Sequence, residues 1–261
     1  MLLLQGPRFY EIVEPHMPIT KLVKLLAVKS IEHAIVIDDG IIIGVVSVKD
    51  VARHIVRAFE AAGSVEALNL NAILGDVVAS IMSRPPYVVS GPLDYCRAAS
   101  IMLSKGIGIL PIVDSSGSFL GAITELDYAL QSLKLDAQAS RYATGKVILG
   151  DPDEPIIEAL GRMYEHGFRR LPLRVGEDYY MATMQSLLLA IARRPHMETL
   201  LEKAYRYSTP ATILDADTAS IANAAETILS IPERAILLRS ADKISILTER
   251  DLVRAYRDEH C

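Results

Sequence analysis

The chain has 261 residues, 51% of them apolar and 23% charged, and its net charge at pH 7 is −5. This length allows one large globular domain or two of ordinary size. The acidic balance argues against a general nucleic-acid-binding surface. The longest apolar runs contain about eight residues, and the roughly 20 that cross a bilayer are nowhere found. The N-terminus also lacks the features of a secretory signal, so a cytoplasmic protein is expected.

Several kinds of reactive site are missing from the sequence. Cys96 and Cys261 form neither a disulfide framework nor a metal-ligand spacing, and no role is assigned to them. We find no phosphate-binding loop, nucleophile elbow, His-Glu-x-x-His or Cys-x-x-Cys motif, and no acid/base carboxylate pair. The sequence therefore predicts a protein that is not an enzyme, with no catalytic residue, metal site or catalytic cofactor.

In chain order, four segments share one pattern. Each begins with a pair of extended apolar residues, continues into a helix of about 12 residues, and ends with two short strands and a second helix. In the first two copies an Asp/Gly turn is expected to join the two strands. From the second residue of the leading pair to the opening of the hairpin we count 22 positions in every copy. These openings are Ile35, Pro111, Pro172 and Ile236. The sequence therefore predicts an α/β (α+β) fold built from four βαββα repeats.

The expected repeats cover residues 1–60, 70–134, 141–195 and 200–257. A unit of this size is too small to bury a good core alone, so repeats are expected to pack in pairs through their sheets and helices. The prediction is two modules of neighbouring repeats, residues 1–134 and 135–261.

Polar residues recur where the second hairpin strand meets the following helix. A hydroxyl residue ends that strand in every copy: Ser47, Thr124, Thr183 and Thr248. Three residues later an aspartate follows in three copies: Asp50, Asp127 and Asp251. A hydroxyl, a carboxylate and free helix N–H groups suit the ribose and phosphate of a nucleotide. The same pattern is also typical of helix capping, and this alternative stays open.

The third copy departs from this pattern. Ser186 stands where the other copies have aspartate, and Tyr180 where two of them have glycine. We expect its cleft to be empty or altered.

Basic residues before the first hairpin strand suggest a phosphate site. Arg170 and Arg234, with Arg169 beside the first, lie in the third and fourth copies, so residues 135–261 are expected to hold phosphates. Solvated arginines are the alternative, and His33 at the equivalent place is expected to be structural. The leading segments that contain Tyr87 and Thr212 are expected to hold the base, with Tyr87 either stacking on a purine or filling the core.

Two motifs connect this pattern with a known family. Gly-x-x-[Ser/Thr]-x-x-Asp follows the second strand at residues 44–50 and 121–127, and Gly-x-x-x-x-Pro precedes the first at 106–111 and 167–172. Together they resemble the cystathionine-β-synthase-type (CBS) repeat. The resemblance implies two Bateman modules, commonly assembled as a flat disc, whose clefts bind AMP, ADP, ATP or S-adenosylmethionine. It implies a stand-alone regulatory module for energy sensing that signals to a separate protein partner or to a second copy in a homodimer.

Other functions remain possible from the sequence. A ligand-free scaffold for oligomerisation would need the same fold without the nucleotide. A nucleic-acid adaptor is supported only by the local arginines and is opposed by the acidic charge.

Overall fold

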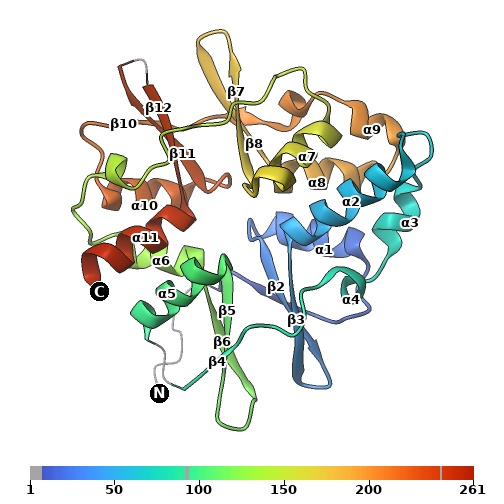
Figure 1. Ribbon diagram of the computed structural model, residues 1–261, viewed down its shortest axis with the longest axis horizontal. Helices are drawn as coiled ribbons and strands as arrows, with labels where there is room; N and C mark the ends of the chain where they lie inside the picture. The colour runs from blue at the N-terminus through green and yellow to red at the C-terminus, as the bar shows by residue number, and fades with distance from the viewer. Residues whose placement is uncertain (1–7, 92–93, 242) are drawn as a thin grey trace. The chain divides into compact units, whose positions relative to one another are not determined.

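The computed structural model describes residues 8–91, 94–241 and 243–261 (Figure 1). The described chain is a mixed α+β fold with four three-stranded sheets, which confirms the predicted fold class. By its packing it divides into two compact units. One unit, here the repeat-1/3 unit, contains residues 10–86 and 148–210. The other, the repeat-2/4 unit, contains Phe9 and residues 87–147 and 211–261. None of the helices in the described ranges is long and apolar enough to span a membrane.

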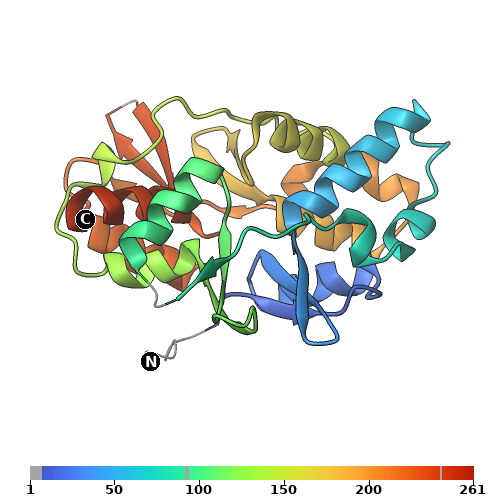
Figure 2. The ribbon, with the colours of Figure 1, turned by 60° about the horizontal axis from the view of Figure 1, so that its bottom comes forward.

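The repeat-1/3 unit holds the first and third copies of the pattern. The first copy comprises β1 (Glu11–Val13), α1 (Ile19–Val28), β2 (His33–Asp38), β3 (Ile41–Ser47) and α2 (Val48–Ala62), followed by α3 (Leu70–Gly75) and α4 (Val78–Ile81). The third comprises α7 (Ile156–His166), β7 (Arg170–Val175), β8 (Asp178–Thr183) and α8 (Met184–Arg193), followed by α9 (Met197–Leu201), η2 (Ala204–Tyr207) and β9 (Thr209–Pro210). Helices α1 and α2 of the first copy pack against α7 and α8 of the third (Figure 2).

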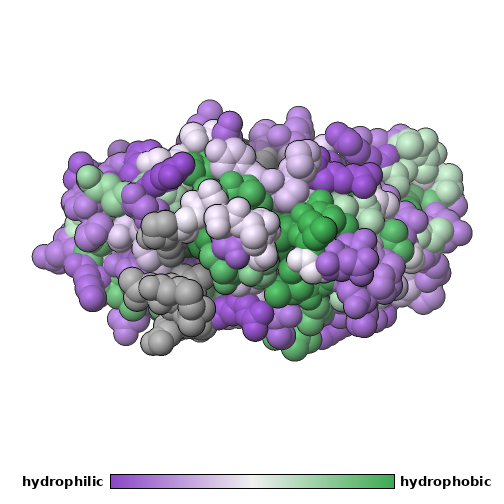
Figure 3. Space-filling model, turned by 90° about the horizontal axis from the view of Figure 1, so that it is seen from below, coloured by the Kyte–Doolittle hydropathy of each residue, from purple (hydrophilic) through white to green (hydrophobic). Residues whose placement is uncertain are grey.

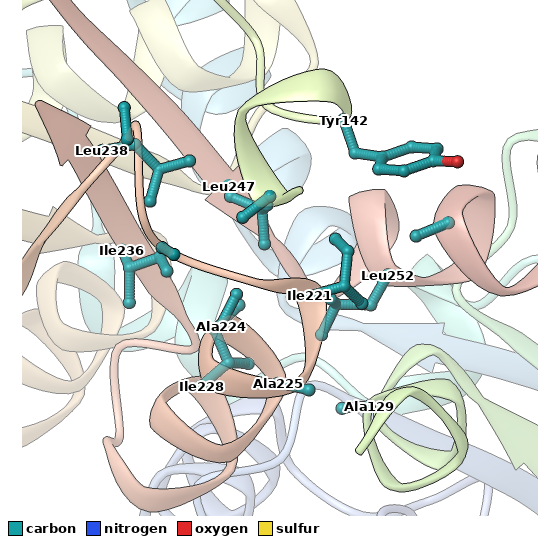
Figure 4. Close-up of a cluster of buried hydrophobic side chains, with 14 of the residues drawn as sticks. Ala129, Tyr142, Ile221, Ala224, Ala225, Ile228, Ile236, Leu238, Leu247 and Leu252 are labelled. Atoms are coloured by element: carbon teal, nitrogen blue, oxygen red, sulfur yellow. The ribbon is translucent and has the colours of Figure 1, made fainter. Parts of the chain in front are cut away.

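The repeat-2/4 unit holds the second and fourth copies. The second comprises β4 (Val89–Ser90), α5 (Tyr95–Lys105), β5 (Ile109–Val113), β6 (Phe119–Thr124) and α6 (Glu125–Ser132), followed by η1 (Ala139–Arg141). The fourth comprises β10 (Ile213–Asp215), α10 (Ile221–Ser230), β11 (Ala235–Ser240), β12 (Lys243–Thr248) and α11 (Glu249–His260). Its core lies between β11, β12 and α10 and reaches Ala129 of α6 and Tyr142, as Figure 4 shows.

In both units the packing between the two repeats is made mainly by helices. It joins the first copy to the third and the second to the fourth. The grouping of neighbouring copies through their sheets, in residues 1–134 and 135–261, stays a prediction.

Each hairpin follows local sequence signals. In the first copy, Asp39 and Gly40 connect β2 to β3 and both have positive φ, at 46° and 81°. Two residues of positive φ make the type I′ turn that matches the twist of paired strands. The Asp/Gly turn expected from the sequence is therefore present.

The outer edge of the second hairpin strand is covered by the leading segment of another copy. Val45 pairs with Ser83, Ile246 with Thr144, and β8 with β9. Gly44 permits the first of these contacts, because a Cβ there would lie 2.5 Å from Met82 Sδ. Ser83 precedes the second copy, Thr144 the third and β9 the fourth, so these three leading segments each contribute to the sheet of another copy.

The equal spacing counted in the sequence does not correspond to equal strand pairing in the fourth copy. Val13 pairs with Val36 and Val89 with Ile112, partners 23 residues apart, but Ile213 pairs with Leu237, 24 residues on. The fourth copy therefore has one extra residue before β11. Arg234, which lies in this connection, has a φ of 54°. A positive φ is uncommon for a residue with a side chain.

The two cysteines form a disulfide, so the expectation that they have no role is corrected. Cys96 in α5 and Cys261 after α11 have Cα atoms 5.7 Å apart and are separated by 165 residues. Three tyrosines of the same unit, Tyr95, Tyr128 and Tyr256, pack edge to face beside it, with ring centroids 5.4 to 6.3 Å apart. Helices α5 and α11 meet only in the folded chain, which is why the spacing did not reveal the bond.

Apolar side chains also reach the surface, as the view from below shows (Figure 3). Among the residues that the structure describes, the large apolar ones more than half exposed are Val28, Ile41, Leu120 and Leu201. They are scattered over both units, and single exposed residues of this kind are normal on soluble domains.

Candidate functional site

The sheet register brings the predicted site residues of each copy to one end of its hairpin. His33 pairs with Ser47, Ile109 with Thr124, and Arg170 with Thr183. The first helical N–H also donates to a carbonyl of the residue pair before the hairpin: Val48 to Glu32 (3.1 Å), Glu125 to Gly108 (3.2 Å) and Met184 to Arg169 (2.8 Å). The hydroxyl, the helix N-terminus and the pre-strand pair are therefore neighbours in these copies.

The aspartates cap the helices that follow the hairpins. Asp50 Oδ2 accepts hydrogen bonds from Ser47 N–H (2.8 Å) and Oγ–H (2.7 Å). Asp127 Oδ2 accepts the same pair from Thr124 at 2.6 and 2.8 Å. These are reciprocal capping arrangements. Oδ2 of each carboxylate thus forms the cap, and Oδ1 takes no part in it.

The fourth copy repeats this arrangement at the start of α11. Asp251 Oδ2 accepts from Thr248 N–H at 2.8 Å and from its Oγ1–H at 3.0 Å. Asp251 Oδ1 accepts from Arg254 Nη2 at 2.7 Å, and Asp50 Oδ1 is bound in the same way by Arg53 Nη2. Capping is therefore one role of these residues, and nucleotide binding stays a prediction.

Burial affects the ionisation of two of the carboxylates. Burial raises the pKa of Asp127, although its hydrogen bonds from Thr124 oppose the shift. Burial likewise raises the pKa of Asp251, against the opposing effects of Thr248 and Arg254. Both groups have lost hydration that a ligand with hydroxyl donors would replace.

The third copy has a neutral cap. Ser186 N–H donates to Thr183 Oγ1 at 2.9 Å, and Ser186 Oγ–H donates to the Thr183 carbonyl at 2.9 Å. The Tyr180 ring packs edge to face on Tyr205, with centroids 4.8 Å apart. No carboxylate from this helix turn is present to accept ribose hydroxyls, and the altered third cleft stays a prediction.

The third copy does contribute a buried charge cluster. Arg169 Nη1 lies 2.6 Å from Glu32 Oε2, and Arg170 Nη1 lies 2.8 Å from Glu32 Oε1. All three side chains are 10% exposed or less. Lys49, from the first turn of α2, donates to the carbonyl of Gly167 at 2.5 Å. Arg169 and Arg170 are therefore buried in the repeat-1/3 unit and do not behave as solvated surface arginines.

Arg234 is placed differently from Arg170. The extra residue before β11 puts Ala235, and not Arg234, across from Thr248. Arg234 Nη1 donates to the carbonyls of Ile228 (3.0 Å) and Leu229 (2.7 Å), the last turn of α10. A guanidinium in this place stabilises the end of a helix. The equivalence of Arg234 with Arg170 is therefore wrong, and its phosphate role remains only a prediction.

The residues expected to hold a base lie in extended segments. The Thr212 carbonyl accepts the N–H of Leu237 at 2.9 Å, so its backbone continues the β10–β11 pairing. Tyr87 is 47% exposed, and Lys105 Nζ lies 5.7 Å from its ring centroid. The Tyr87 ring is thus not ordinary core filling.

Sequence reasoning missed three participants. Arg53 and Arg254 each lie three residues after an aspartate, and this Asp-x-x-Arg spacing is visible in the sequence. Glu32 precedes His33 in the sequence and carries no signal there, because only the fold brings it to Arg169 and Arg170.

Comparison with known proteins identifies the family. The family model of the CBS domain matches residues 10–57, 78–130 and 139–182, more than half of the chain. The chain belongs to the CBS domain family. The fourth copy, which the family model does not match, has the same strand and helix order as the second.

The relatives are partial or distant. L-aspartate semialdehyde sulfurtransferase of Methanocaldococcus jannaschii is 30% identical over 40% of this chain, but the match spans only 20% of its own length. The crystal structure of protein MJ1225 from the same organism is similar over 97% of both chains, with a TM-score of 0.81 and 18% identity, and shows the shared fold. CBSX2, solved in complex with AMP, is 27% identical over 46% of this chain and 87% of its own, with a TM-score of 0.37.

Proposed function

We propose that this protein is a regulatory module that binds an adenine nucleotide, AMP, ADP or ATP, or S-adenosylmethionine, and signals the bound state to a partner. One observation carries the proposal. In three of the four copies, a carboxylate at a helix N-terminus accepts a hydrogen bond from the strand-end hydroxyl through Oδ2. Its second oxygen, Oδ1, is not part of this cap. A carboxylate oxygen beside helix N–H groups suits a ribose hydroxyl next to a phosphate.

The buried arginines supply the second part of the site. Arg170 is the first residue of β7 and Arg169 precedes it, and Lys49 of α2 donates to the carbonyl of Gly167 just before them. Guanidinium groups bind phosphate oxygens through paired N–H donors, and burial strengthens such contacts. The phosphates of a nucleotide therefore have cationic partners from both copies of the repeat-1/3 unit.

Glu32 suggests how binding is signalled. Its carboxylate comes from the first copy and holds both arginines of the third. A phosphate that takes over these guanidinium groups competes with Glu32 and changes the contact between the two copies. A ligand shifts a conformational equilibrium by its different affinity for the two states, and this exchange of partners provides such a difference.

Calorimetric titration with AMP, ADP, ATP and S-adenosylmethionine tests the proposal. We expect saturable binding of at least one ligand, weakened about tenfold or more by D127N at a site in the repeat-2/4 unit and by R170M at a site in the repeat-1/3 unit, because each removes a charge-assisted contact. S186A is the matched control, since this copy has no carboxylate to lose, and it should bind as the parent does. No heat at millimolar concentration of all four ligands would refute nucleotide binding.

A structural scaffold is the second candidate. It is favoured by the capping bonds, which are complete without any ligand. If D251N, D127N and D50N change neither nucleotide binding nor the partner bound, the scaffold is the better explanation. Turnover of a nucleotide by the purified protein would instead establish an enzyme.

A further inference from the structure

The three carboxylates differ in what their second oxygen contacts. Asp50 Oδ1 accepts from Arg53 Nη2 at 2.7 Å, and Asp251 Oδ1 accepts from Arg254 Nη2 at 2.7 Å. In the second copy the residue three positions after Asp127 is Leu130. Among the described residues, no side chain other than Thr124 donates a hydrogen bond to Asp127.

The arginines compete directly with a ribose. A guanidinium on a carboxylate forms a charge-assisted bond, roughly twice as strong as a neutral one, and a ribose hydroxyl is a neutral donor. Arg53 is held further, since its Nη2 also donates to the carbonyl of Ile81 at 3.0 Å. The hydroxyls of a ligand must therefore displace an ion pair at Asp50, while at Asp127 they meet a carboxylate oxygen without a cation.

The environment of Asp127 favours the same outcome. Its side chain is half-buried, whereas Asp50 and Asp251 are buried at 7% and 5% exposure, and partial loss of solvent raises its pKa. A desolvated carboxylate gains more from new hydrogen bonds than a hydrated one. Leu130, three residues further along α6, is half-buried and carries no charge.

From this asymmetry we infer that the residue three positions after the aspartate sets the affinity of each copy for ribose. Leu130 leaves Asp127 open to a ribose, whereas Arg53 and Arg254 block the other two aspartates. The inference rests on the proposed function and adds an order of filling. The second copy fills first, and the first and fourth copies fill only when a ligand displaces the arginine.

Exchange of these residues tests the inference, with adenosine as the probe because it carries the ribose diol and no phosphate that would attract the arginines. We expect one dominant site in the parent protein, lost in D127N. L130R should weaken that site about tenfold or more, by placing a guanidinium on Asp127 Oδ1. R53M should add a second site of comparable affinity, since it removes the cation and keeps most of the volume.

Leu189 provides the matched control. It lies three residues after Ser186 and is half-buried like Leu130, so L189R introduces the same side chain at the equivalent place without a carboxylate. L189R should bind adenosine as the parent does, and thermal melting of L130R and L189R should show that both are folded. Equal binding by L130R and the parent, or a dominant site that survives D127N, would overturn the inference alone. Binding of neither adenosine nor any nucleotide by any variant would remove the proposed function as well.

Discussion

Cys96 and Cys261 are joined by a disulfide that connects the first turn of α5 to the residue after α11. Both helices pack in the repeat-2/4 unit, where Tyr256 of α11 contacts Tyr95 of α5. Tyr95 also accepts a hydrogen bond at its carbonyl from Tyr128, the residue after Asp127. The disulfide therefore connects two helices that support the Asp127 site.

Loss of this disulfide should destabilise the protein substantially. A cross-link between residues 165 apart removes much of the freedom of the unfolded chain, and such bonds typically contribute about 2–5 kcal/mol. We expect C96S, or treatment with dithiothreitol, to lower the free energy of unfolding by this order, measured by urea denaturation. The reductant should have no effect on C96S. Two free thiols in the untreated protein, found by mass spectrometry after alkylation, would contradict the bond.

The buried carboxylates predict opposite pH dependences for stability and binding. Because the native pKa values of Asp127 and Asp251 are raised, the folded protein keeps these protons at a pH where the unfolded chain has lost them. Their contribution to the free energy of unfolding should therefore fall as pH rises from the unfolded to the native pKa. Ribose hydroxyls need the ionised carboxylate as acceptor, so affinity should rise over the same range.

Paired measurements separate these effects. Thermal melting of D127N without ligand should show a smaller loss of stability with rising pH than the parent. Adenosine titrations between pH 4 and 7 should show parent affinity increasing with pH and D127N affinity low and nearly constant. Parent affinity that decreases with pH would argue against Asp127 as the acceptor.

The sequence predicted features that depend on neighbouring residues. The helix starts at Ser47, Thr124 and Thr248 and the turn at Asp39–Gly40 followed from local patterns, because capping and turn geometry are decided within a few residues. Four repeats could be predicted for the same reason, since every copy carries its own strand and helix signals. The hydroxyl and carboxylate pairs could thus be named, but not the partner of each Oδ1 atom.

Long-range relationships could not be predicted in this way. Glu32 and the arginines of the third copy are more than 130 residues apart in the chain, and the two cysteines 165. The extra residue before β11 was also missed, because a count along the chain does not show where a strand pairing begins. The ion pairs, the disulfide and the strand register were therefore missed, because all of them are determined by how the chain packs.

Replacement of Glu32 should lower the free energy of unfolding, because it breaks the buried ion pairs with Arg169 and Arg170. E32Q leaves Arg169 and Arg170 without this carboxylate, and breaking a buried ion pair typically costs about 3–5 kcal/mol. Urea denaturation should show a loss of this order, whereas E60Q on the exposed side of α2 should differ little from the parent. Inorganic phosphate should recover part of the E32Q loss if the arginines hold phosphate. An E32Q protein as stable as E60Q would show that other contacts suffice.

Replacing each of three glycines by alanine should affect the stability of the protein differently. A Cβ at Gly150 would lie 2.7 Å from Leu171 Cδ2 and 2.7 Å from Leu173 Cδ2, and both leucines are fully buried and cannot move aside. G150A should therefore lower the free energy of unfolding by about 1–3 kcal/mol, the usual cost of overpacking. A Cβ at Gly161 within α7, or at Gly145, meets no atom within 4 Å.

G161A should raise the stability by about 1 kcal/mol, because alanine favours a helix interior more than glycine does. G145A should change it by less than about 1 kcal/mol in either direction. Thermal melting of the three variants side by side measures the differences. If G150A were as stable as G145A, the leading segment of the third copy would not lie against β7 as closely as the bridge between Gly150 and Leu173 requires.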